Sequence, residues 1–502
     1  MKYIRIRLAL LTTLITLSSL FCQSTRITIL HTNDMHASFL PHEAYWVRSD
    51  VKPMVGGFLE LNRLIDSIRS VKNNVLLIDA GDVMTGNPIA EIEYKGAIGG
   101  ALFEMMNMMG YEAWTIGNHD LDISQENLRK LTKIAKFPTL SANLVDSSNN
   151  YPLNNKEYII VNKGGLRVGI IGVMSNALFE LTNTNNLKGL KVLPAIETTQ
   201  KIIDEIDPKT DVIIALTHQG IEDDSILAVH VKHLDVIIGS HSHTRLKFPK
   251  KINGVLICQT GAYCENLGEL ELTVDNDSII ESDGKLHTLW AKSEYPENDF
   301  SRFVREFKEK VDKEYSTIVG KTEVDLKRSR SGESNIGSLV AEAIREGSGA
   351  DFGIVNSSGI RKDISAGDIK KLDLFELSPF RNYLCTFPIK GREIREMVER
   401  HLESIVSGRT SLDFSGIKCE WKNVNGKIEI VSLKIGGSNI EDDKTYVCGT
   451  IDFVINQASK YLDIEPKDVK STSILLFDAL VRKVKKDKVI KNLSNSNFIK
   501  VK

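Results

Sequence analysis

Short apolar runs that end in polar, turn-forming residues recur through the first half of the chain. These runs are RITIL, NVLLI, YEAWTI, DVIIAL and LDVIIG. Between them lie stretches with the apolar spacing of amphipathic helices, for example residues 57–71 and 196–206. Short apolar runs bounded by turn residues predict buried strands. Their alternation with helices predicts an α/β layered domain.

Each run is followed at once by residues whose side chains can bind metals or move protons. The segments are HTNDMH, DAGDVMTGNP, GNHDLD, THQG and SHSHT. Because the carboxyl ends of strands in such sheets share one edge, we expect these side chains to lie within reach of one another. They are Asp34, His36, Asp82, Asn118, His119, His218, His241 and His243. A single histidine after a strand is usually an ordinary surface residue, whereas a repeated ending of this kind indicates a common site.

The ligand types in this set are imidazole, carboxylate and amide oxygen, without thiolate. Such a set suits zinc, manganese, iron or cobalt, and it has too many histidines for a calcium site. The ligands outnumber those of one tetrahedral ion, which indicates two divalent ions that share a carboxylate. Two ions about 3.5–4 Å apart are a common arrangement for in-line attack at phosphorus. Asp82 is the predicted bridging ligand, and Gly81 and Gly86 allow the backbone to approach closely.

The order of NDMH, AGD, GNHD, THQG and SHSH along the chain resembles the calcineurin-like metallophosphoesterases. A narrower resemblance is to the secreted 5′-nucleotidase family. It lies in ILHTNDMHASF, in the pair Gly56 and Gly57, and in GNHDLD. Two later segments resemble the C-terminal substrate domain of that family. They are VNSSGIRKDISAGDI (residues 355–369) and SPFRN (residues 378–382).

The resemblance implies a fold of the α/β class with two domains. One is an N-terminal layered β-sandwich metallophosphoesterase domain flanked by helices, and the other is a smaller C-terminal α+β substrate-binding domain. We place the first at residues 26–297, a linker helix at residues 298–316 and the second at residues 317–502. The apolar spacing in FSRFVREFKEKVDKEY supports the linker helix. A chain of 502 residues is also too long for one ordinary core.

The resemblance also assigns roles to the residues of the site. One ion falls to Asp34, His36, Asp82 and His243, and the other to Asp82, Asn118, His218 and His241. His119 is the implied catalytic histidine, and its implied partner is Asp122 and not the adjacent Asp120. The ions make hydroxide available for in-line attack on phosphate, while His119 stabilises charge or helps the leaving group to accept a proton. The alternative is that His119 and Asp122 only orient Asn118.

The second domain carries the residues that the resemblance implies for substrate binding. They are Asn356, Arg361, Asn382 and Phe453. In this family a purine-like base stacks between two aromatic rings, but Ser411 stands where the first ring is expected. The segment NQASKYL also lacks the aspartate that contacts ribose in the family. Loss of one ring weakens base binding by roughly 1–3 kcal/mol.

The expected function is therefore that of a 5′-nucleotidase-like, two-metal phosphomonoester hydrolase. The alternatives are a cyclic-nucleotide phosphodiesterase, a nucleotide-sugar hydrolase, a related sulfur-ester hydrolase, or a non-catalytic surface binding protein on the same fold. The net charge of −2 argues against a broad surface for nucleic acid polymers. The expected partner is a nucleotide or another small phosphoester, and no protein partner is implied.

The N-terminus has the features of an export signal. Three basic residues within the first seven precede an apolar stretch from Leu8 to Phe21, which is short for a membrane span. We expect residues 1–22 to be a signal peptide and the protein to be periplasmic or part of the cell envelope. Cys22 is a candidate for attachment of a lipid anchor, and ordinary cleavage nearby is the alternative.

The other five cysteines form no C-x-x-C pair, and their number is odd. They therefore indicate neither a thiolate zinc site nor a disulfide-dense scaffold. Cys258 and Cys264 either bridge a short loop or remain two buried thiols.

Overall fold

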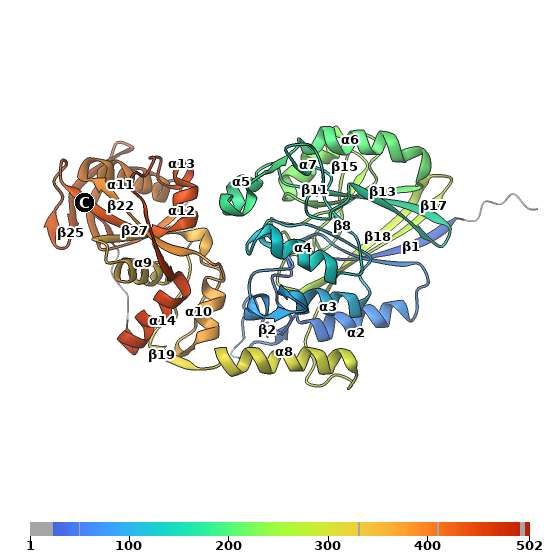
Figure 1. Cartoon of the computed structure of the whole chain (residues 1–502), viewed down its shortest axis with the longest axis horizontal. Helices are drawn as coiled ribbons and strands as arrows, with labels where there is room; N and C mark the ends of the chain where they lie inside the picture. The colour runs from blue at the N-terminus through green and yellow to red at the C-terminus, as the bar shows by residue number, and fades with distance from the viewer. Residues whose placement is uncertain (1–23, 50, 330–331, 409–410, 492–496, 502) are drawn as a thin grey trace, which may run out of the picture.

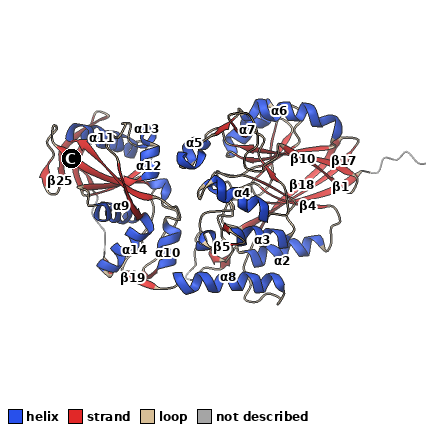
Figure 2. Ribbon diagram, in the orientation of Figure 1, coloured by secondary structure: helices blue, strands red, loops and turns tan. Residues whose placement is uncertain are grey.

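Two mixed sheets pack face to face in the N-terminal half of the chain (Figure 2). The structure is a computed structural model that describes residues 24–49, 51–329, 332–408, 411–491 and 497–501 (Figure 1). The expected signal peptide at residues 1–22, with Cys22, lies outside the described residues. Within the described part of the chain, no helix combines the length and apolar character needed to cross a bilayer.

The two sheets contain all five strands that the apolar runs predict. The first sheet has the order β18 (Ser278–Thr288), β17 (Asn266–Asp275), β1 (Thr25–Thr32), β4 (Val75–Asp79), β7 (Ala113–Thr115) and β8 (Thr139–Leu140). The second has the order β10 (Tyr158–Lys163), β11 (Leu166–Met174), β13 (Val212–His218), β14 (Val236–Ile238), β16 (Val255–Cys258) and β15 (Lys250–Ile252). The predicted strands are thus divided between two sheets instead of lining one.

Apolar side chains fill the space between the sheets and cover both outer faces. Along β1, Ile27 and Ile29 point between the sheets, and Leu30 points to the outer face of the first sheet. Helices α2 (Phe58–Arg69), α3 (Gly100–Met109), α4 (Gln125–Ile134) and α8 (Asp299–Tyr315) pack on that face. Helices α6 (Ala195–Ile206) and α7 (Ile221–His230) pack on the outer face of the second sheet. The strands are apolar on both sides because both sides are covered. The expected β-sandwich flanked by helices is confirmed.

The strands that carry the motifs run parallel within each sheet, so their carboxyl ends lie at one end of the sandwich. β1 pairs in parallel with β4, β4 with β7, and β13 with β14. The loops that follow them are bonded to one another, since the Asp34 N–H donates to the Gly81 carbonyl and the His36 N–H to the Asp82 carbonyl. Strands from both sheets therefore contribute to one site.

Helix α8 leads from the first half of the chain to the second and runs along the lower edge in Figure 1. It begins with a capping box in which Asn298 and Ser301 exchange hydrogen bonds. Phe300, Val304 and Phe307 lie on its buried face and join the core of the N-terminal half. The helix is thus fixed to the first half before the chain enters the second.

Three small sheets and a group of helices build the C-terminal half. The first sheet has the order β23 (Leu412–Ser415), β20 (Phe352–Asn356), β27 (Thr445–Ile451), β22 (Tyr383–Lys390) and β28 (Lys470–Leu475). The second has the order β26 (Ser438–Asn439), β25 (Lys427–Ile435), β24 (Ile417–Val424) and β30 (Phe498–Lys500). The third has the order β21 (Gly367–Lys370), β19 (Ile318–Thr322) and β29 (Val489–Ile490). The helices are α9 (Asn335–Ser348), α10 (Lys371–Leu377), α11 (Gly391–Val406), α12 (Asp452–Asn456), α13 (Ala458–Tyr461) and α14 (Leu476–Asp487). One core joins them, which gives this half the expected α+β character.

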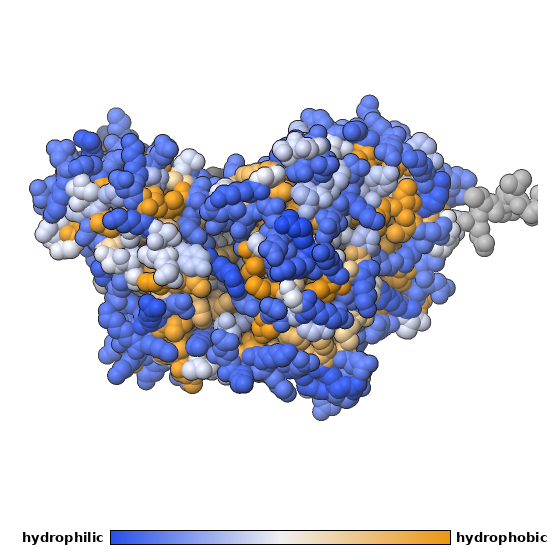
Figure 3. All heavy atoms as spheres, in the orientation of Figure 1, coloured by the Kyte–Doolittle hydropathy of each residue, from blue (hydrophilic) through white to orange (hydrophobic). Residues whose placement is uncertain are grey.

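Two further features of the fold are the hydropathy of its surface and the state of two buried cysteines. Figure 3 shows a mostly hydrophilic outer surface with apolar patches where the two halves of the chain meet. Cys258 and Cys264 are both buried and free, so no disulfide closes the loop between them. Burial raises the pKa of each thiol to about 12, which leaves both protonated at neutral pH.

Candidate active site

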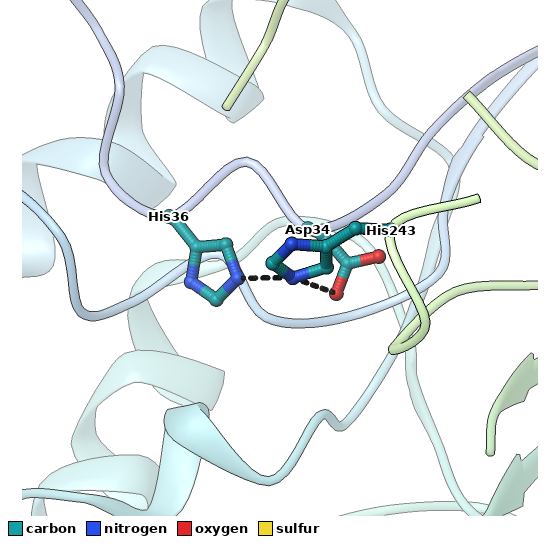
Figure 4. Close-up of side chains that lie close together, drawn as sticks. All are labelled: Asp34, His36 and His243. Atoms are coloured by element: carbon teal, nitrogen blue, oxygen red, sulfur yellow. Dashed lines mark hydrogen bonds and ion pairs between the residues drawn. The ribbon is translucent and has the colours of Figure 1, made fainter. Parts of the chain in front are cut away.

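The loops after the parallel strands bring three predicted ligands together in a first cluster (Figure 4). His36 Nε2 lies 3.0 Å from His243 Nε2, and His243 Nε2 lies 3.7 Å from Asp34 Oδ1. Asp34 and His36 come from the loop after β1, whereas His243 comes from the loop after β14. The three ligand atoms converge on one point, as ligands of a single cation do.

Asp82, His218 and His241 form a second cluster beside the first. Asp82 Oδ2 lies 3.1 Å from His218 Nε2 and 4.0 Å from His36 Nε2, so this carboxylate oxygen stands between the clusters. Asn118 Oδ1 lies 3.2 Å from His218 Nε2 and 3.0 Å from His241 Nδ1. The structure therefore gathers every residue of the predicted ligand set in one place.

Hydrogen bonds to the backbone set which nitrogen of two imidazoles faces the site. His36 Nδ1 lies 3.0 Å from the Thr85 carbonyl oxygen, and His218 Nδ1 lies 2.9 Å from the Ala80 carbonyl oxygen. A carbonyl can only accept, so each Nδ1 carries a proton and each Nε2 is the nitrogen turned toward the site. Such outer contacts are the usual means of orienting a histidine ligand.

Burial and charge make the clusters suitable for divalent cations. Burial, opposed by His218 and reinforced by Asp82, raises the pKa of Asp34 to about 7. Burial lowers the pKa of His241 to about 4 and that of His243 to about 3, which keeps both imidazoles neutral. Burial lowers the pKa of His218, but the charge of Asp82 outweighs it and raises the pKa to about 10, so a cation that binds here displaces a proton from His218. Imidazole and carboxylate are donors that bind such cations. The residues present therefore fit two divalent metal ions.

Many of the clustered residues hold an unusual backbone conformation. The φ angles are 48° at Asp34, 47° at His36, 58° at Asp82, 71° at His241 and 54° at His243. Residues other than glycine rarely adopt this left-handed region, and each such residue costs on the order of 1 kcal/mol or more. Strain of this kind gathers at functional sites, where the surrounding structure enforces it.

His119 lies beside the clusters and is held by Asp122. His119 Nδ1 lies 2.8 Å from Asp122 Oδ2, to which Thr85 Oγ1 also donates at 2.9 Å. Burial lowers the pKa of His119, but the charges of Asp122 and Asp82 outweigh burial and raise it above its usual value. With Nδ1 bonded to Asp122, Nε2 is the nitrogen left to face a substrate.

A cleft of about 380 Å³ opens beside the first cluster and is lined by both halves of the chain. His36 and Thr85 line it from the N-terminal half, and Arg361 and Phe380 line it from the C-terminal half. The Phe380 ring stacks on the His119 imidazole at 5.4 Å, and the Arg361 guanidinium lies 5.9 Å from the centre of the Phe380 ring. Of the predicted ligands, His36 lines this cleft, so a phosphoester bound here would meet both His36 and Arg361.

Two family models match the chain, one after the other. The model described as calcineurin-like phosphoesterase matches residues 27–245, and the model described as 5′-nucleotidase, C-terminal domain, matches residues 316–463. The chain belongs to the 5′-nucleotidase family. As a calcineurin-like phosphoesterase, it is a metal-dependent phosphohydrolase.

Individual relatives of this 5′-nucleotidase-family chain match along most of its length. Protein UshA of Yersinia enterocolitica is 27% identical over 490 residues, which cover 85% of this chain and 84% of that protein. The 5′-nucleotidase of Vibrio cholerae is 28% identical over 481 residues, which cover 84% of this chain and 83% of that protein. Among solved structures, the 5′-nucleotidase precursor of Thermus thermophilus superposes with a TM-score of 0.80 at 26% identity, over 95% of this chain and 99% of that one.

The other substrate-binding residues predicted for this 5′-nucleotidase-family chain do not line the cleft. Asn356 is buried, and its side-chain amide donates to Ser358 Oγ at 3.0 Å. The backbone carbonyl of Asn382 accepts from the N–H of Leu476. The Phe453 ring lies 6.1 Å from that of Tyr461. Their assignment as substrate contacts stays a prediction.

Sequence reasoning missed the role of Asp120. Its Oδ2 accepts from the N–H of Asp82 at 3.0 Å and of Gly117 at 2.8 Å. Its Oδ1 accepts from the N–H of Val83 at 3.0 Å and of Met84 at 3.1 Å. Asp120 thus holds the loop that presents Asp82. The segment GNHD contains this aspartate, but nothing in the sequence distinguishes a carboxylate that binds backbone from one that binds metal.

Proposed function

We propose that this protein hydrolyses nucleoside 5′-monophosphates to nucleoside and inorganic phosphate with two divalent cations. The observation that carries the proposal is the pair of ligand clusters around Asp82, beside a cleft that is lined by His36 and Arg361 and by Phe380, whose ring stacks on His119. The metal-dependent phosphohydrolase class follows from the family, and the substrate is our proposal.

We assign one cation to Asp34, His36, Asp82 and His243, and the other to Asp82, Asn118, His218 and His241. When bound, the cations supply Lewis-acid chemistry, since they neutralise phosphate charge and make hydroxide available near neutral pH. The metals are zinc, manganese, cobalt or iron by the nature of the donors. The left-handed backbone at several of these residues is consistent with a site that the fold holds ready for its ions.

The chain's own residues position the substrate and supply a proton. Arg361 has no carboxylate partner among the described residues, so its guanidinium is free to pair with the phosphate group. His119 retains a proton because Asp122 raises its pKa, and Nε2 can donate that proton to the departing ester oxygen. Phe380 covers the His119 ring and keeps water away from it.

Export is part of the proposal and rests on the basic and apolar residues before Cys22. Cell fractionation tests it, and incorporation of labelled fatty acid into wild type but not Cys22→Ser tests the lipid anchor. A protein that stays in the cytoplasm would refute export, and equal labelling of the two forms would refute the anchor at this cysteine.

Chromatography of the products formed from a substrate panel tests the enzymatic proposal, because only the monophosphate esters release inorganic phosphate in a single hydrolysis. The panel contains nucleoside 5′-monophosphates, cyclic nucleotides, nucleotide sugars and a sulfur ester, each assayed with manganese, zinc or cobalt and with a chelator. We expect hydrolysis of nucleoside monophosphates that chelation abolishes. Faster hydrolysis of another class would refute the substrate. Absence of bound metal and of hydrolysis throughout the panel would favour a surface binding protein.

A further inference from the structure

Tyr45, Trp46 and Tyr263 of the N-terminal half line the cleft. Tyr263 packs against His36 and His243 of the first cluster, which leaves Tyr45 and Trp46 as the two rings whose ring contacts lie outside the clusters. Tyr45 and Trp46 lie between strands β2 (His42–Glu43) and β3 (Met54–Val55), and they are 48% and 43% exposed. Exposed aromatic rings gathered in one cavity mark binding sites more often than they occur at random. We call Tyr45 and Trp46 the aromatic wall of the cleft.

Neighbouring side chains hold the aromatic wall in place. The Arg245 guanidinium lies over the Trp46 ring at 5.1 Å, and the Trp290 ring lies beside it at 6.4 Å. The Lys52 ammonium lies over the Tyr45 ring at 5.4 Å. Cation–aromatic contacts of this kind restrict the rings without burying them. The wall is therefore a preformed surface, which lowers the entropy cost of binding a flat ligand.

The charges along the cleft limit the class of ligand. Among the described arginine and lysine side chains that line it, Arg328 pairs with Asp363 at 2.9 Å, and Lys362 pairs with Glu376 at 2.5 Å. Arg361 has no such partner. One unpaired cation suits one phosphate group. The remaining apolar lining is Leu40, Pro41, Leu372 and Pro379.

The aromatic ring that the C-terminal half contributes to this cleft is Phe380, and one of its faces is stacked on His119. Ser411 stands where the family's first ring is expected, and Phe453 lies outside the residues that line the cleft. The cleft volume of about 380 Å³ lies in the range of small-molecule sites. A ring held in this cleft therefore meets aromatic surface from the N-terminal half.

We propose that Tyr45 and Trp46 form the subsite for the leaving group, and that this subsite takes a flat, uncharged ring such as a nucleobase. This inference rests on the proposed function, because the phosphate is placed at the metal clusters and Arg361. It names the substrate class more narrowly, as monophosphate esters whose leaving group carries an aromatic ring.

Kinetics with two substrates tests the subsite. AMP carries the ring, and ribose 5-phosphate carries the same phosphate and sugar without it. We expect Trp46→Ala to lower the ratio of kcat/KM for AMP to that for ribose 5-phosphate by about five- to a hundredfold, the range of base–aromatic stacking. Phe248→Ala removes an aromatic side chain that is 73% exposed and lies outside the cleft, so it serves as the matched control. A ratio unchanged in Trp46→Ala, or lowered instead in Phe453→Ala, would overturn the inference.

Binding without catalysis separates this inference from the proposed function. Calorimetry with adenosine and the metal-free protein measures ring binding alone, and thermal melts check that each variant is folded. We expect wild type and Trp46→Phe to bind adenosine and Trp46→Ala to bind it at least fivefold more weakly. If no nucleotide is hydrolysed but this pattern holds, the proposed function fails and the subsite stands. If AMP is hydrolysed but wild type and Trp46→Ala bind adenosine with the same affinity, the subsite is refuted and the proposed function is supported.

Discussion

Replacement of Asp120 by asparagine tests whether the Asp120 carboxylate holds in place the loop that presents Asp82. Its two oxygens each accept two backbone N–H groups. In Asp120→Asn, the amide nitrogen replaces one oxygen and faces two N–H donors, so two hydrogen bonds are lost. Each buried donor left without an acceptor costs about 1–3 kcal/mol, which gives a loss of about 2–6 kcal/mol. For a domain of this size the melting temperature should fall by on the order of 5–15 °C.

Thermal unfolding of the metal-free protein measures this loss, and calorimetric titration with manganese measures metal affinity. Asp122→Asn is the matched control, because it changes the same atoms two residues away and affects a side-chain contact with Thr85 but no acceptor of a backbone N–H in the loop that presents Asp82. We expect Asp120→Asn to lower both the melting temperature and metal affinity, and Asp122→Asn to lower neither by a comparable amount. Equal melting temperatures for the two variants would refute the reasoning.

Four further predictions follow from the site. Asp82→Asn should abolish turnover because both ligand clusters depend on this carboxylate, and phosphate release within tenfold of wild type would contradict its bridging role. Arg361→Ala should raise KM for AMP about ten- to a hundredfold through loss of a charge-assisted contact, and an equal rise in Arg328→Ala, whose arginine is already paired, would argue against it. His119 is protonated below its raised pKa and loses the proton as pH rises through that pKa. Asp122→Asn removes the charge that raises this pKa, so it should shift the alkaline limb of the pH–kcat profile to lower pH. An unmoved limb would exclude His119 as the acid. Chelation should abolish activity and lower the melting temperature, since ions that bind only the folded state stabilise it; a melting curve unaffected by the removal and return of manganese would speak against the metal site.

Much of the N-terminal half could be predicted because its signals are local. The buried strand Val75–Asp79 is apolar from Val75 to Ile78, and the chain then turns, so the ligand motif stands directly after the apolar run. The order of these motifs was enough to select the residues, from Asp34 to His243, that the structure brings together in two clusters. Parallel pairing then brings their loops to one end of the sandwich without further information.

The distinction between Asp120 and Asp122 shows where a motif stops being informative. His119 opens a short 3₁₀ turn, so the side chain three residues later returns to the same side and bonds the imidazole. Asp120 points to the opposite side and binds the loop of Asp82. The family resemblance indicated the first relation, whereas the second became visible only once the two loops were seen packed together.

The cleft depended on the tertiary structure. Phe380 reaches His119, and Arg361 and Trp46 line the same cleft, although the residues of each pair lie in separate halves of the chain. Phe453, which the motifs predicted as a substrate contact, lies elsewhere. Which side chains border such a cavity depends on how two folded halves pack, and that is the sum of many weak contacts between distant segments. A strand or a ligand motif is encoded within a few consecutive residues, but the walls of this cleft are not.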